Sequence, residues 1–194
     1  MSGISIEVEL QEAEAQARLR ALLDRMDRRQ PFFAAVGEIL VASAGRNFQA
    51  QSGPDGKAWT PLRPKTVKAR TRAGQLPLTI LRSNSRGKIG SSLAGSINYQ
   101  ASNDEVRIGS PVEYAAIHQL GGTIQKPARA AKIYRKRGED GKIGRRFVKK
   151  SEADVVTDVE IGAHAITIPA RPFLGVSAAD QEDIFDAAED WLGA

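Results

Sequence analysis

Two periodicities in the placement of apolar residues divide this chain into helical ends and a strand-rich middle. Apolar residues recur at helical spacing over residues 5–28 and again over residues 31–48, where Pro31 suits the first position of a helix. A third helical segment follows Ser177, a good N-cap residue, and Asp180 lies three positions later, where its carboxylate can answer the cap. We therefore expect helices at both ends of the chain. The apolar stripe predicted for the last helix consists of Ile184, Phe185, Ala188, Trp191 and Leu192.

Between these ends, apolar and polar residues alternate with the period of a β-strand. Residues 96–101 and 106–108 alternate on either side of a turn and predict a hairpin with one buried face. Residues 155–161 and 164–168 show the same alternation. Residues 114–120 favour a short helix that ends at Gly121-Gly122. The predicted fold class is therefore α+β, an antiparallel sheet with N-terminal helices and a C-terminal helix.

The composition bounds the class of protein. A chain of 194 residues is most simply one domain. It has no cysteine, which excludes a disulfide framework, thiol catalysis and cysteine-ligated metal sites. Acidic residues near the N-terminus argue against a signal peptide, and no stretch approaches the ~20 apolar residues of a membrane span. We expect synthesis in the cytoplasm, no membrane partner and no cofactor.

Charge is segregated along the chain. Residues 57–88 hold nine bases and no acid, residues 126–150 hold eleven bases and two acids, and the chain from Ser177 onward holds six acids and no base. We expect a single domain over residues 1–194 that carries a flexible basic loop at residues 57–90 and a basic β-hairpin arm within residues 126–164. The arm's cations include Lys132, Arg135, Lys136, Arg137, Arg145, Arg146, Lys149 and Lys150.

Three interpretations of the basic segments remain open. They can be solvated loops, contacts to acidic surfaces of partner subunits, or contacts to DNA phosphates. No helix–turn–helix, zinc finger or single-strand-binding signature accompanies them. If DNA is bound, we expect salt-sensitive contacts to the backbone alone.

Candidate catalytic residues lack the partners that catalysis needs. His118 has no nucleophile and no well-placed carboxylate nearby in sequence, and His164 stands alone. We interpret His118 and Gln119 as polar residues that satisfy backbone groups near a helix end. Trp59 is either a core anchor for its loop or a partner-facing anchor. The acids of the last helix are interpreted as a solvated or inter-subunit face.

Three motif segments nevertheless recur in a recognisable order. The first, residues 48–62, contains Pro54-Asp55-Gly56 and Trp59-Thr60-Pro61-Leu62. The second begins Tyr114-Ala115 and continues through His118-Gln119 to Gly121. The third is Pro169-Ala170-Arg171-Pro172-Phe173-Leu174-Gly175. Together they resemble the phage virion morphogenesis family over roughly residues 30–192. The link over residues 81–93 is longer than is usual in that family.

The resemblance implies a non-enzymatic virion protein of a tailed bacteriophage, active in tail completion or head–tail joining. It implies a neck or tail-top subunit that forms a ring, hexameric or dodecameric, at the head–tail junction. Neighbours would be tail-terminator, tail-tube or connector proteins. The motif residues taken as interface candidates are Trp59, Tyr114, His118, Gln119, Arg171 and Phe173. We expect Arg171, stiffened by Pro169 and Pro172, to make a specific ion pair. The rival hypothesis is a nucleic-acid-binding protein without sequence specificity.

Overall fold

A computed structural model describes residues 12–82, 93–139 and 141–193 of the chain. The fold consists of two compact units. We call Met1–Leu120 with Ala170–Ala194 the core unit, and Gly121–Pro169 the arm unit. The prediction that the whole chain behaves as one domain stays a prediction.

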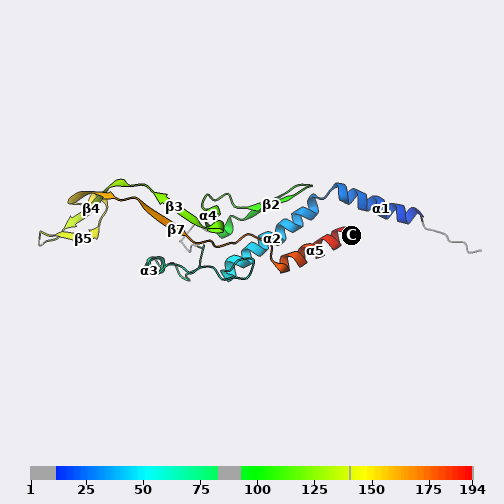
Figure 1. Cartoon of the computed structure of the whole chain (residues 1–194), viewed down its shortest axis with the longest axis horizontal. Helices are drawn as coiled ribbons and strands as arrows, with labels where there is room; N and C mark the ends of the chain where they lie inside the picture. The colour runs from blue at the N-terminus through cyan, green and yellow to red at the C-terminus, as the bar shows by residue number, and fades with distance from the viewer. Residues whose placement is uncertain (1–11, 83–92, 140, 194) are drawn as a thin grey trace, which may run out of the picture. The chain divides into compact units, whose positions relative to one another are not determined.

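Long helices form the framework of the core unit (Figure 1). Helix α1 spans Glu12–Asp27, α2 spans Gln30–Ala50 with Pro31 in its first turn, and α5 spans Ala178–Gly193. Helices α2 and α5 pack against each other, and the rings of Phe32 and Trp191 lie 5.6 Å apart between their centroids. The helices predicted at both ends are confirmed for the described residues. Residues 5–11 of the first predicted helix lie outside them.

A short hairpin packs on α2. Strand β1 (Asn98–Ala101) pairs with β2 (Val106–Gly109), with Tyr99 opposite Ile108, which confirms the predicted hairpin. Both strands contact α2. The Tyr99 ring lies directly over Gly37, where any Cβ would overlap it. The absent side chain of Gly37 is therefore what lets the hairpin approach the helix so closely.

The buried core gathers segments that are far apart in sequence. Phe48 at the end of α2, Trp59, Ile80, Leu93 and Phe173 form one apolar cluster. Leu93 begins the 3₁₀ turn η1 (Leu93–Gly95). All five side chains belong to the core unit, so the stability of the described fold resides there.

The basic segment after Trp59 contains a helix that the sequence pattern did not predict. We expected an irregular loop over residues 57–90, but Pro64–Arg72 forms helix α3. Pro64 occupies its first turn, and Arg70 and Arg72 lie in the last turn, where cations favour the helix dipole. No residue of α3 is buried, and its sequence has no apolar stripe at helical spacing. Because such a stripe is the main sequence signal for a helix, the pattern gave no indication of α3. Flexibility of this segment stays a prediction, and residues 83–92 lie outside the described residues.

The arm unit consists of antiparallel ribbons. Strand β3 (Gly122–Lys126) pairs with β7 (His164–Ile168). A three-stranded sheet places β4 (Arg129–Arg137) between β5 (Ile143–Phe147) and β6 (Val155–Ile161), and the short 3₁₀ turn η2 (Lys150–Glu152) joins β5 to β6. The predicted basic hairpin is thus confirmed, as is the α+β class with antiparallel strands.

The arm unit has no interior of its own. None of its described residues is buried. Phe147 is 70% exposed, and Ile143, Val156 and Ile166 are exposed as well. An isolated two-stranded ribbon such as β3–β7 is marginally stable at best in water, and little apolar burial stabilises the three-stranded sheet.

Candidate functional site

The three motif segments meet in the core unit, at a place we call the motif junction (Phe48, Trp59, Gln119, Arg171 and Phe173). The Phe48 ring packs edge-on against Trp59 with centroids 5.6 Å apart, and lies 5.2 Å from the ring of Phe173. Trp59 Nε1 donates a hydrogen bond of 2.8 Å to the carbonyl of Pro172. Trp59 is only 5% exposed, which selects the core-anchor interpretation over the partner-facing one.

Gln119 joins the second motif to the third. Its Oε1 accepts hydrogen bonds from the backbone N–H groups of Phe173 (2.9 Å) and Leu174 (3.0 Å), and its Nε2 donates to the Leu174 carbonyl (2.8 Å). The short helix α4 (Ala115–Leu120) positions this side chain, and Gly121 ends α4 with a left-handed φ of 72°. As predicted, the Gln119 side chain makes hydrogen bonds to backbone groups, here those of Phe173 and Leu174.

Arg171 is held by carbonyl oxygens. Its Nε donates to Thr60 O (3.0 Å) and its Nη2 to Pro61 O (3.3 Å), while its backbone N–H donates to the His118 carbonyl (2.7 Å). Burial, followed by the positive charge of Arg70, lowers the pKa of this guanidinium. We expected Arg171 to make an ion pair, but none of the ion pairs among the described residues includes it. Its guanidinium donates hydrogen bonds to backbone carbonyls of the first motif instead.

His118 and Tyr114 form no catalytic arrangement. Their rings meet edge to face with centroids 5.8 Å apart, and Tyr114 is exposed. Burial and then the charge of Arg171 lower the pKa of His118, so the imidazole is neutral at pH 7. Its Nδ1 has no hydrogen-bond partner, so no group within the described residues orients it as a base. Among those residues no cluster of three or more ligating side chains could hold a metal ion.

Asp180 corrects our interpretation of the last helix. Its side chain is fully buried, whereas we had placed it on a solvated face with the other acids. One carboxylate oxygen accepts hydrogen bonds from the Ser43 hydroxyl and from both the hydroxyl and N–H of Ser177, and the other lies 2.8 Å from Arg46 Nη2. The Asp180 N–H donates to the Ser177 hydroxyl, so the predicted cap is confirmed.

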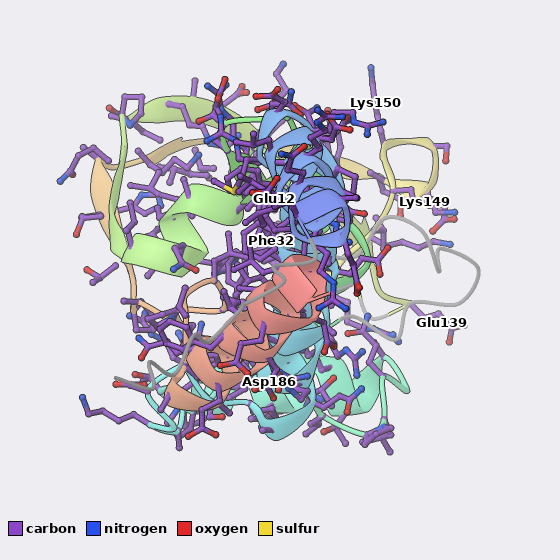
Figure 2. All side chains as sticks on the ribbon, turned by 90° about the vertical axis from the view of Figure 1, so that its right-hand side faces the viewer. Glu12, Phe32, Glu139, Lys149, Lys150 and Asp186 are labelled. Carbon is purple, nitrogen blue, oxygen red and sulfur yellow. The ribbon has the colours of Figure 1, made fainter. Side chains whose placement is uncertain are left out.

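The remaining acids of α5 surround an exposed aromatic ring. Phe185 is 69% exposed, although its place in the apolar stripe predicted burial. Glu182, Asp186 and Glu189 are exposed around it (Asp186 is labelled in Figure 2), and none of them is in an ion pair among the described residues. The sequence could have indicated this face, since positions 182, 185 and 189 lie opposite Ile184 and Trp191 on a helical projection.

A basic depression marks the hairpin of the arm unit. It has a volume of about 640 Å³ and is lined by Phe147, by the acid Glu152 and by five cations. Arg135 lies over the Phe147 ring, 5.6 Å from its centroid, and Lys132 is 3.7 Å from Asp158. Lys149 and Lys150 are exposed and point away from the ribbon (Figure 2). The cations lining the depression are Lys136, Arg137, Arg145, Arg146 and Lys149.

Comparison with known families decides what these segments represent. A model of the phage virion morphogenesis family matches residues 10–193, nearly the whole chain and all three motif segments. The chain belongs to the phage virion morphogenesis family. It is thus a bacteriophage protein with a structural role in virion assembly, as the motif segments predicted.

Relatives from phage Mu and from Mu-like prophages match the chain over 124 to 188 residues. The putative capsid assembly protein G of Escherichia phage Mu is 28% identical over 183 residues, which cover 91% of this chain and 90% of that protein. Mu-like prophage FluMu G protein 2 of Haemophilus influenzae is 25% identical over 188 residues, 96% of each chain. FluMu G protein 1 of the same organism is 30% identical over 124 residues, covering 64% of this chain and 80% of that relative. No solved structure matches the chain.

No helix within the described ranges is both long enough and apolar enough to cross a bilayer.

Proposed function

We propose that this family member is a ring-forming subunit of the head–tail junction of a tailed bacteriophage, and that it acts in tail completion or head–tail joining. In this proposal it is not an enzyme and needs no cofactor. It assembles in the host cytoplasm with copies of itself and with tail-terminator, tail-tube or connector proteins. The name of the phage Mu relative, a putative capsid assembly protein, is consistent with such a role.

The observation that carries the proposal is an arm unit without buried residues. Residues 121–169 form a separate compact unit in which no described side chain is buried and Phe147 is largely exposed. Exposed apolar groups of this kind mark surfaces that bind other proteins. A subunit whose ribbons need cover from outside is suited to an assembly, where neighbours supply that cover.

The motif junction supports a structural role. Its polar side chains bond to the backbone of other motif segments, and none is arranged as a nucleophile, base or oxyanion donor. The family motifs thus hold the core unit together. The motif residues account for the fold of the core unit. The contacts with other proteins would then be made by the arm unit and by the exposed faces of the core unit.

The test is the mass of the purified full chain by light scattering behind a sizing column, alone and with tails that lack this protein. We expect a closed oligomer, alone or on the tail end, and restored joining of heads to tails. A monomer that neither assembles nor joins tails would contradict the proposal.

A second candidate function is DNA binding through the phosphate backbone. It is favoured by the cations of α3 and of the basic depression, none of which is in an ion pair among the described residues. If this function holds, duplex DNA is retained by the chain with an affinity that falls steeply as salt rises. The same preparations can be assayed for retention, so both candidates are compared directly.

A further inference from the structure

We propose that the basic depression of the arm unit of one copy receives the Phe185 face of α5 from a second copy. The Phe185 face is defined as Phe185 with Glu182, Asp186 and Glu189. The inference rests on the proposed ring and names the contact that would join neighbouring subunits. It is a head-to-tail contact between two different surfaces, which is the type that generates rings.

On the donor side, α5 presents an aromatic ring in an acidic setting. Phe185 is 69% exposed on a helix whose opposite side is held by the Asp180 network and by Trp191. Large exposed aromatic side chains at the centre of a polar rim are typical of interface hot spots. Positions 182 and 189 lie about 10 Å apart along the helix, so carboxylates flank the ring on both sides.

On the acceptor side, the depression presents a matching ring in a basic setting. Phe147 lines it and is 70% exposed, and cations outnumber acids five to one around it. Its volume of about 640 Å³ lies in the range of clefts that enclose a ligand of moderate size, so an aromatic side chain with its neighbours can enter. Two phenylalanine rings in contact would add a specific geometry to the match.

Charge complementarity selects a second copy as the occupant. The charged residues of the Phe185 face are all acids and those of the depression are almost all bases, and none of either set is in an ion pair among the described residues. Complementary potentials favour the correct pairing of surfaces and the correct register. Binding of duplex DNA in the depression would not explain why Phe185 and the acids around it are exposed on α5. Binding of a second copy explains both the basic depression and the acidic Phe185 face.

The experiment uses two charge-reversed forms of the full chain. In the arm form, Arg145→Glu, Arg146→Glu and Lys149→Glu leave the depression with two bases and four acids, so that it becomes acidic. In the α5 form, Glu182→Lys and Glu189→Lys make the Phe185 face basic. The matched controls reverse the same numbers of charges on other surfaces, all of them on the core unit: Lys65→Glu with Lys68→Glu and Arg72→Glu for the arm form, and Glu12→Lys with Glu113→Lys for the α5 form. Circular dichroism and thermal unfolding confirm that every form is folded before its mass is measured.

We expect the arm form and the α5 form each to assemble at least about tenfold more weakly than the wild type and the controls. Mixed in equal amounts they should assemble again, because each acidic depression then meets a basic Phe185 face and the charges alternate around a ring of even number. Only a contact between copies predicts this rescue.

Other outcomes would overturn the inference. If both forms assemble as the wild type does, the ring stands and this contact is wrong. If the mixture fails to assemble, docking between copies is wrong. If the arm form assembles normally but loses salt-sensitive retention of duplex DNA, the depression binds nucleic acid instead. A wild-type chain that never assembles, even with tails, contradicts the proposed function itself. An independent variant, Phe185→Ala with Val176→Ala as its control, should weaken assembly without changing the unfolding temperature.

Discussion

A single amide side chain links the second and third motif segments. Gln119 makes three hydrogen bonds to the backbone of Phe173 and Leu174 within a partly buried site. The Gln119 side chain therefore satisfies backbone groups of Phe173 and Leu174 that a neighbouring β-strand would otherwise satisfy. A residue with this role must carry both an acceptor and a donor, which glutamine does and glutamate does not.

We predict that Gln119→Leu lowers the free energy of unfolding by about 2–3 kcal/mol, because it leaves two N–H groups and a carbonyl without partners. Urea denaturation checks this. Gln181→Leu, at an exposed position of α5, is the control and should change the free energy little. An unchanged midpoint for Gln119→Leu would show that water replaces the amide.

Asp180 couples folding to pH. Burial raises the pKa of this carboxyl, but the bonds from Ser177 and Ser43 and the charge of Arg46 outweigh burial and hold the pKa below its ordinary 3.8. The unfolded chain then takes up this proton at a higher pH than the folded chain does. The stabilisation is present above pH 3.8 and is lost as the pH falls through the lower folded value.

We predict that wild-type stability declines with pH below about 4 more steeply than that of Asp180→Asn, which is itself less stable at pH 7. Urea denaturation from pH 7 to pH 3 measures both. Asp186→Asn, on the exposed side of α5, should match the wild type at pH 7. Equal pH profiles for wild type and Asp180→Asn would refute the coupling.

At the scale of elements, the sequence predicts those whose apolar residues repeat. Helices α2 and α5, the β1–β2 hairpin, the β4–β5 hairpin and strands β6 and β7 were predicted and are confirmed, whereas strand β3 was not predicted. Helix α3 has none because nothing buries one of its faces. The burial of Asp180 was missed for another reason: its partners Ser43 and Arg46 lie 137 and 134 residues away. Local patterns cannot indicate contacts of that separation.

The site was predictable to a similar extent. The family was identified because the three motif segments follow one another along the chain in the family's order, and Gln119 was expected to bond to backbone groups, although its partners 54 and 55 residues away were not. The exposure of Phe185 and the carbonyl contacts of Arg171 depend on how segments pack in three dimensions. The sequence therefore indicated which residues matter but not which atoms they contact.

The separation of the two units leads to a prediction about the arm. Replacing residues 127–163 by Asn-Gly would join β3 to β7 through a tight hairpin turn, since Lys126 and His164 are already paired. No buried residue is removed, so we expect the unfolding temperature of the core unit to change by less than about 3 °C while assembly is lost. Calorimetry and light scattering measure the two effects. Retained assembly would show that the arm is dispensable.

At the scale of the whole molecule, charge is divided between surfaces. A net charge of +5 conceals an acidic C-terminal helix and two strongly basic segments. Such a molecule attracts copies of itself over long distances only where salt does not screen the charges. The Debye length falls from about 10 Å at 0.1 M salt to about 3 Å at 1 M.

We therefore predict that assembly of the full chain in solution weakens as salt rises from about 0.1 M to about 1 M. Light scattering at several salt concentrations measures the change. The arm form and the α5 form described above should lose this dependence, because they no longer bring opposite charges together. Assembly that strengthens with salt would indicate that apolar contacts dominate the interface.

Because no described residue of the arm unit is buried, digestion of that unit by a protease can report whether a subunit is assembled. Lysine and arginine side chains are open to solvent along most of β4 and β5, so trypsin can reach them in a free subunit. Once a neighbour covers the ribbons, the same bonds are shielded. The rate at which trypsin cuts residues 121–169 would then report the fraction of unassembled subunits in a mixture.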